Sequence, residues 1–278
     1  MIELATDFRP AVDELFTSES KTSLVTNRDF DWTGAHTIKV YKIGSASMSD
    51  YQRNADVLVG NKSRYGEIET LEASTEEMTI SKDRSFTFAI DRLDADETKG
   101  TLAAASALAR QQREKVIPEV DAYVYGVMAA KAGIKPAAEA LTAENIYQKI
   151  VAAGVAMDEA EVPQDERVLI LTPTTYALLK ASSATFQNSD LGEELRRKGV
   201  VDRLDGLNVI KIASNRLPEH FGFMIAHPCA TVAPVKLEEY RIHEQPQFIS
   251  GSLVEGRICY DAFVLENKAK AIYYQATV

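Results

Sequence analysis

Residues 94–132 carry the longest helical pattern in the chain. Apolar or small residues recur there at steps of three and four, which places them along one face of a helix. Pro118 lacks the amide proton that would bond to Glu114, so we expect the helix to bend around Val116–Pro118 rather than to stop there. The predicted apolar stripe, broken at Gln112, consists of Leu102, Ala105, Ala109, Val116, Val120, Tyr123, Val127 and Ala130.

Two alternating segments ahead of this helix predict strands, at His36–Ile43 and Ser85–Ile90. The mainly polar residues Ser45–Arg84 between them are far too many for an ordinary hairpin loop. Because the flanking strands can pair, we expect a two-stranded arm that projects from the body. A lone ribbon is marginally stable in water, so a neighbouring chain should cover it. Its expected contact residues are Arg53, Lys62, Arg64 and Tyr65.

Residues 1–35 combine acidic and Ser/Thr-rich stretches with isolated aromatic residues, which indicates an extended arm. We expect its aromatic side chains Phe8, Phe16 and Trp32 to dock on a neighbouring chain. A second candidate contact is the charged group Arg110, Arg113 and Glu114, just before the expected bend. A solvated helix face is the alternative interpretation of that group.

The second half of the chain predicts an α/β unit followed by further strands. The apolar run 168–171 is typical of a buried central strand, and Thr172-Pro173 after it can cap a helix. The terminal strands should form the sheet on which the long helix lies, with Val254, Ile258 and Tyr260 on one face and Asp261 on the other. The expected segments are helices 143–156 and 173–182, strands 168–171, 209–212, 221–226, 239–243 and 253–265, and a hairpin turn at 266–268 into 269–275.

Charge and composition narrow the functional class. The 278 residues carry a formal net charge of −10 with a pI near 5.0, which argues against a protein that grips nucleic acid through a basic surface. No apolar run approaches a membrane span, and residues 1–4 do not start a signal peptide, so we expect an intracellular protein. Cys229 and Cys259 are expected to be a free, buried pair.

Sequence motifs for catalysis are missing. There is no phosphate-binding loop, dinucleotide-binding turn, nucleophile elbow or His-Glu-x-x-His helix. His227-Pro228-Cys229, with His220, His243 and Cys259, contains zinc-ligand residue types, but its spacing matches no known finger, and turn and core roles are favoured. The sequence therefore predicts no enzyme, no cofactor and no metal site.

Four strings, taken in order, resemble the major capsid proteins of tailed bacteriophages, which have the Hong Kong 97-like fold. No single string is a catalytic signature, and the likeness depends on the order of all four across nearly the whole chain. They are Phe30–Gly34 leading into Ile38–Tyr41, Asp83–Asp91, Ala109–Gln111 leading into Val116–Tyr123, and Val254–Arg257 leading into Tyr260–Leu265.

The resemblance implies an α+β fold with four parts. These are an N-terminal arm (1–35), an extended β-hairpin loop (36–91), a peripheral domain with a long spine helix (92–135 and 231–278) and an axial α/β domain (136–230). It also implies self-assembly into hexamers and pentamers of an icosahedral shell, formed in the bacterial cytoplasm and present in the virion. The shell would enclose double-stranded DNA without sequence-specific binding and without a membrane.

The resemblance further implies a portal, a separate scaffolding protein if Met1 is the native start, and in some cases decoration proteins. Two other interpretations are open. One is an encapsulin-like nanocompartment shell that encloses enzymes rather than DNA. The other is a soluble α/β enzyme or ligand-binding protein, which would need a deep pocket with convergent polar groups.

Overall fold

The computed structural model describes residues 19–27, 37–51, 53, 62–71, 73–93, 103–182 and 203–278. The chain divides into two units. The larger unit consists of Met1–Thr33 and Ser81–Val278, and the smaller one, here called the ribbon unit, of Gly34–Ile80. Within the described residues no helix is long and apolar enough to cross a membrane.

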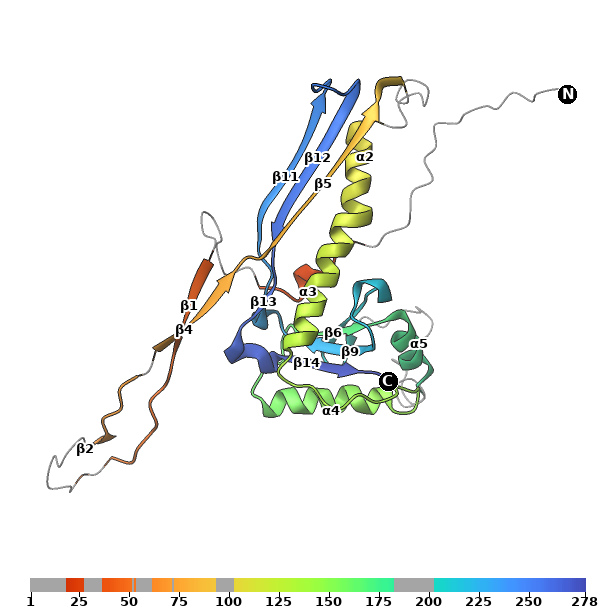
Figure 1. Cartoon of the computed structure of the whole chain (residues 1–278). Helices are drawn as coiled ribbons and strands as arrows, with labels where there is room; N and C mark the ends of the chain where they lie inside the picture. The colour runs from red at the N-terminus through yellow and green to blue at the C-terminus, as the bar shows by residue number, and fades with distance from the viewer. Residues whose placement is uncertain are drawn as a thin grey trace. The chain divides into compact units, whose positions relative to one another are not determined.

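The long helix of the larger unit consists of α2 (Ala104–Gln111), a π-helical segment (Gln112–Val116) and α3 (Ile117–Lys131). The amide of Ile117 donates to the carbonyl of Gln112, five residues back, directly before Pro118. Figure 1 shows the helix changing direction between α2 and α3, which confirms the predicted bend. The helix begins later than predicted, because Ala103 is extended; residues 94–102 lie outside the described residues.

The predicted apolar stripe is wrong in detail. In α3 the buried residues include Asp121, Val124 and Met128, each one position after the predicted Val120, Tyr123 and Val127, which are half-buried. A π turn contains one more residue than an α turn, so every position after it rotates by one residue. In α2 the buried residue is Ala107, whereas the predicted Ala105 and Ala109 are exposed, as is Ala130 in α3.

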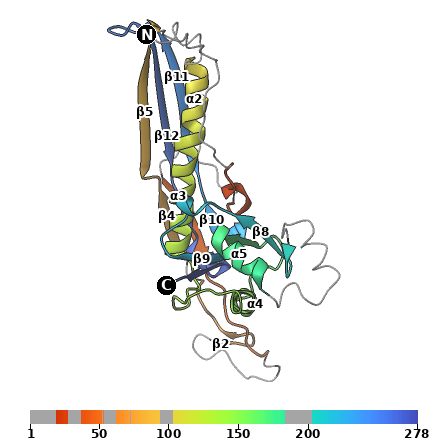
Figure 2. The same ribbon diagram turned by 90° about the vertical axis from the view of Figure 1, so that its right-hand side faces the viewer.

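A three-stranded antiparallel sheet lies against this helix. Its strand order is β11 (Val235–Glu244), β12 (Gly251–Tyr260), β5 (Lys82–Asp91). Figures 1 and 2 both show α2 alongside these strands, and α2 contacts β12. The expected support of the helix by the terminal strands is therefore confirmed, and Val254, Ile258 and Tyr260 are buried as predicted. Asp261, expected on the other face, is also buried, because β12 ends at Tyr260 and the alternation stops there.

The ribbon unit is built on β1 (Thr37–Ile43), which pairs antiparallel with β4 (Ala73–Thr79), and on the short hairpin β2 (Lys62–Ser63) and β3 (Gly66–Glu67). The predicted pairing of 36–43 with 85–90 is wrong, because 85–90 lies in β5 and pairs with β12. Most residues of β4 are polar, so its sequence lacks the apolar alternation that would have identified it as a strand.

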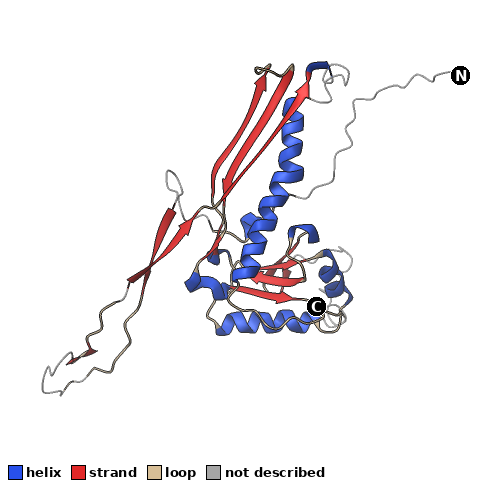
Figure 3. Ribbon diagram, in the orientation of Figure 1, coloured by secondary structure: helices blue, strands red, loops and turns tan. Residues whose placement is uncertain are grey.

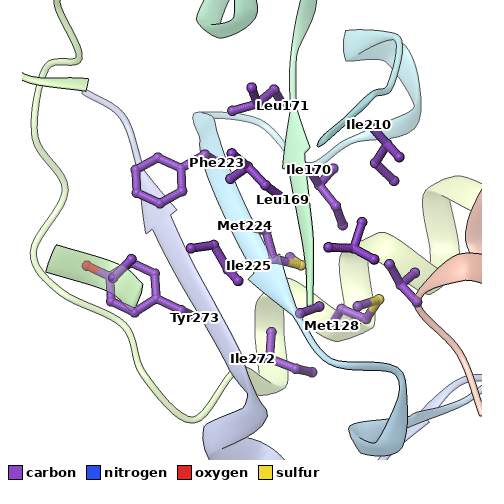
Figure 4. Close-up of a cluster of buried hydrophobic side chains, with 14 of the residues drawn as sticks. Met128, Leu169, Ile170, Leu171, Ile210, Phe223, Met224, Ile225, Ile272 and Tyr273 are labelled. Carbon is purple, nitrogen blue, oxygen red and sulfur yellow. The ribbon is translucent and has the colours of Figure 1, made fainter. Parts of the chain in front are cut away.

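A five-stranded sheet forms the core of the predicted α/β unit. Its order is β14 (Ile272–Ala276), β9 (Phe221–Ala226), β6 (Val168–Leu171), β8 (Leu207–Lys211), β7 (Arg203–Leu204). All four residues of β6 are buried, and β6 runs parallel to β8 and antiparallel to β9. Figure 4 shows Leu169 and Ile170 of β6 beside Met224 of β9 and Met128 of α3. The predicted central strand is confirmed.

Two helices accompany this sheet, α4 (Ile146–Glu159) and α5 (Pro173–Ala181), and Figure 3 shows both beside the strands. Helix α4 buries Ile146, Ile150 and Ala153, which were all predicted to face inward. Helix α5 starts at the predicted cap: the Thr175 amide donates to the Thr172 hydroxyl, and the Thr175 hydroxyl accepts from the Thr172 amide.

The end of the chain differs from the prediction. No hairpin turn forms at 266–268; a 3₁₀ helix, η5 (Glu266–Ala271), leads into β14, which pairs with β9. Residues 272–276 therefore complete the sheet of the 136–230 segment, although the predicted division places them with 231–278. The four-part division itself stays a prediction. The remaining strands, β10 (Thr231–Val232) and β13 (Phe263–Val264), pair with each other.

Candidate assembly surfaces

The ribbon unit exposes large apolar side chains. Tyr41 is 73% exposed, Met48 99%, Tyr65 79% and Ile68 61%. The strand pair is held by ion pairs between Lys39 and Glu77 and between Lys42 and Glu76, and by a hydrogen bond of 2.8 Å between the hydroxyls of Thr37 and Thr79. Exposed apolar side chains on a two-stranded ribbon are unfavourable in water, so this surface is a candidate contact site.

Three of the predicted ribbon contacts lie together in the β2–β3 hairpin. Lys62 is in register with Glu67, and Arg64 and Tyr65 form the exposed turn. The Tyr65 ring meets the Tyr51 ring edge to face, with 5.0 Å between the ring centres. Arg53, the fourth predicted contact, is also exposed. These positions fit a contact surface, and their role between subunits stays a prediction.

The N-terminal arm is only partly described, and its described part folds on its own chain. Val25 is fully buried, and the Asn27 amide donates to the Thr231 carbonyl at 2.7 Å. The Ser20 hydroxyl donates to Oδ1 of Asp121 at 2.6 Å. The expected docking on a neighbouring chain concerns the aromatic side chains of the arm, and it stays a prediction. Phe8, Phe16 and Trp32 lie outside the described residues.

The Asp121 carboxylate, which Ser20 contacts, belongs to a buried ion pair. Its Oδ2 accepts a hydrogen bond from Nη1 of Arg216 at 2.7 Å, and both side chains are almost completely buried. The Tyr125 hydroxyl is buried nearby and has no hydrogen-bond partner among the described residues. Burial, with a smaller contribution from the Asp121 charge, raises the pKa of Tyr125 well above its usual range. This cluster joins α3, the 214–216 turn and the arm.

Sequence reasoning did not identify this cluster. Asp121 and Arg216 are 95 positions apart, so no local pattern could link them. The one available signal was an acidic residue at the spacing of the apolar positions Val124, Tyr125 and Met128.

Asp261 forms a second buried junction, where β5 begins and β12 ends. Its Oδ2 accepts from the backbone amide and the hydroxyl of Ser81, at 2.7 and 2.9 Å. Its Oδ1 accepts from the Tyr123 hydroxyl at 2.7 Å and from the Ala262 amide at 2.8 Å. Burial, together with this carboxylate, raises the pKa of Tyr123 to about 12. Four hydrogen bonds thus compensate the buried charge.

The predicted charged group Arg110, Arg113 and Glu114 lies at the π-helical segment and the end of α2. Arg110 is in the last turn of α2 and is half-buried, Arg113 is exposed, and Glu114 is half-buried. Beyond it, Nε of Arg84 on β5 contacts Oε1 of Glu119 on α3 at 2.7 Å. The helix fixes the positions of these charged residues, and their contact with a neighbouring subunit stays a prediction.

His227 has a local structural role. Its Nδ1 accepts a hydrogen bond from the Cys229 amide at 3.1 Å, which caps a 3₁₀ turn. Burial lowers the pKa of His227, and the carboxylate of Glu166 opposes this effect. Cys229 and Cys259 are free as predicted, but both are half-buried rather than buried. Among the described residues no three His, Cys, Asp or Glu side chains form a group that can hold a metal ion.

Several clefts open on the described surface of the larger unit. One of them, of about 540 Å³, lies between α4, the loop at 158–167 and the β7–β8 turn. Valines line one side, and Arg167 is already bonded to Asp158 at 2.7 Å.

No protein-family model and no curated protein matches the chain. Solved bacteriophage structures do match it, over nearly its whole length. A structure from Mycobacterium phage Che8 covers 99% of this chain and 96% of its own at 16% identity, with a TM-score of 0.79. The capsid structure of the cyanophage P-SCSP1u covers 99% of this chain and 93% of its own at 15% identity, with a TM-score of 0.78. The mature capsid structure of bacteriophage PhiM1 covers 100% of this chain and 92% of its own at 13% identity, with a TM-score of 0.73. The chain therefore has the α+β fold of tailed-phage capsid proteins.

Proposed function

We propose that this chain is the major capsid protein of a tailed bacteriophage or prophage. It assembles into pentamers and hexamers of an icosahedral shell that encloses double-stranded DNA. The observation that carries the proposal is the match of 99–100% of the chain to solved phage capsid structures. A fold shared over the full length, including the ribbon unit, supports a shared role more strongly than a match to one domain would.

The surface of the ribbon unit supports this proposal. Tyr41, Ile43, Met48, Tyr65 and Ile68 expose apolar area that a second copy can bury, and contacts repeated around closed rings add up to a stable shell. The proposed role is structural and requires no catalysis. A portal, scaffolding and decoration proteins, assembly in the host cytoplasm and location in the virion belong to the same proposal.

Assembly can be tested with a double variant of the ribbon unit. Ile68→Asp with Leu71→Asp places charge at two exposed apolar positions and should leave the helix content unchanged. We expect the wild-type chain to form shells or rings in electron micrographs and the variant to remain unassembled, because a buried unpaired charge costs several kcal/mol per contact.

A matched control adds the same charge in the same unit without removing apolar area. Ser45→Asp with Thr70→Asp changes two exposed polar positions and should retain assembly. Normal shells from the Ile68/Leu71 variant would show that this apolar surface is not an assembly contact. A wild-type chain that stays monomeric with every partner supplied would contradict the proposed function.

A further inference from the structure

Four exposed lysines lie close together where the end of α3 meets η5, and among the described residues they have no carboxylate partner. Many other positive side chains are paired, for example Arg84 with Glu119 and Arg257 with Asp83. Within the described residues, no carboxylate lies within ion-pair distance of these four, and one of them donates instead to a helix carbonyl. In a chain of net charge −10, unpaired positive charge is notable. The four residues, here called the lysine patch, are Lys131, Lys135, Lys268 and Lys270.

The lysine patch is brought together by a close contact between two segments that are distant in sequence. The Gly133 amide donates to the Ala269 carbonyl at 2.8 Å, and the Ile134 amide donates to Ile272. A Cβ atom at Gly133 would stand 2.5 Å from the backbone of Ala269 and Lys270, so only glycine permits this approach. Figures 1 and 2 show the end of α3 next to the η5 segment that precedes β14. The lysines flank this contact on both segments.

Clustered like charges repel one another, so an anionic partner would relieve the repulsion. Lysine carries a compact charge on a flexible stem, which suits contacts to phosphate but does not read bases. Double-stranded DNA presents about one negative charge per 1.7 Å of helix axis, a regular array that several lysines can meet together. We infer that the lysine patch contacts the phosphate backbone of double-stranded DNA, an inference that rests on the proposed enclosure of DNA.

The net negative charge of the chain should weaken the contact between the lysine patch and DNA. The net charge of −10 repels DNA at long range, so each copy should bind weakly and without sequence preference. Many copies around one DNA molecule would add their weak contacts. An acidic segment of a second copy is the other partner with matching charge. Measuring DNA binding and shell formation in the same variants distinguishes the two partners.

Binding is measured by fluorescence anisotropy with the full unassembled chain and a labelled duplex of about 24 mixed base pairs, at about 50 and 200 mM salt. Four phosphate contacts should weaken wild-type binding by about 10²-fold across this range. Lys268→Gln with Lys270→Gln should bind more weakly and lower the slope of log affinity against log salt by about 2.

The control is Lys115→Gln with Lys236→Gln, two exposed lysines outside the patch that change the net charge by the same amount. Equal weakening in both variants, or no wild-type binding at low salt, would overturn the inference. Loss of shells in the patch variant with unchanged DNA binding would also overturn it and indicate a protein partner. A wild-type chain that forms no shells but binds DNA through the patch would contradict the proposed function alone.

Discussion

At the scale of single residues, the larger unit depends on a few buried polar groups. The Asp121–Arg216 pair is nearly inaccessible to water, whereas the Asp83–Arg257 pair lies on the exposed face of the sheet. A buried ion pair contributes little net stability compared with an apolar pair, but removing one partner leaves an uncompensated charge. The two pairs therefore predict different responses to the same substitution.

Asp121→Ala should destabilise the larger unit by about 3–5 kcal/mol, because the buried Arg216 would lose the carboxylate that neutralises its charge. Asp83→Ala should have a much smaller effect, because Arg257 would be hydrated at the surface. Urea unfolding followed by circular dichroism measures both. Equal losses of stability would show that Arg216 is hydrated in the native state.

The burial of His227 leads us to expect that the stability of the folded chain depends on pH. Its pKa is lowered in the folded chain, mainly by burial, so protons bind the unfolded chain more readily. The stabilising contribution is complete above the ordinary pKa of about 6.5 and is lost as the pH falls from there toward the lowered folded value. The charged groups around the ring are Glu166, Arg167 and Lys268, and the backbone carbonyl of Asp165 accepts a hydrogen bond from the ring.

We expect His227→Asn to reduce the loss of stability between pH 7.5 and about 5.5, because asparagine can cap the turn without titrating. His220→Asn is the control, since His220 is exposed and asparagine tolerates its left-handed backbone. Urea midpoints at the two pH values provide the measurement. An unchanged pH dependence in His227→Asn would assign the effect to other groups.

At the scale of elements, strong local patterns were predictable and non-local pairings were not. The buried run of β6 and the Thr172-Pro173 start of α5 are encoded within a few residues, and both were found as predicted. The bend at Pro118 was also predictable. The one-residue rotation of the α3 face was not, because a sequence shows that a proline disturbs a helix but not whether a π turn absorbs the disturbance.

Replacing Gly126 in α3 and Gly133 just after it by alanine should change the stability of the chain in opposite directions. Around Gly126 in α3, apart from its chain neighbours and the backbone of the helix itself, no described residue has an atom within 4 Å of the place where a Cβ would stand. Gly126→Ala should therefore stabilise the chain by about 0.5–1 kcal/mol, through helix propensity and a less flexible unfolded state.

Gly133→Ala should destabilise the chain, because its Cβ would collide with backbone atoms of Ala269 and Lys270 that cannot move aside. Thermal melting of the two variants tests the pair of predictions, with opposite shifts of the midpoint expected. A lower midpoint for Gly126→Ala would show that the folded helix needs flexibility there.

At the scale of the whole molecule, the sequence predicted the α+β class and the capsid-like fold, which the full-length structural matches confirm. It did not predict the partners of β1 and β14. Polar β4 gave no signal for β1, and the pairing of β14 with β9 joins segments about fifty positions apart. The candidate contacts Arg53, Arg64 and Tyr65 were visible as charged or aromatic residues in a polar stretch, whereas the Asp121 and Asp261 junctions exist only in three dimensions.

The position of β14 at the edge of the five-stranded sheet has a consequence for biosynthesis. During translation β6, β8 and β9 leave the ribosome well before residues 272–276, and until these arrive the outer edge of β9 has no strand beside it. An uncovered edge invites wrong pairing with other nascent chains. The sheet is therefore completed only after residues 272–276 have been synthesised, and a product truncated before them would leave the edge of β9 uncovered.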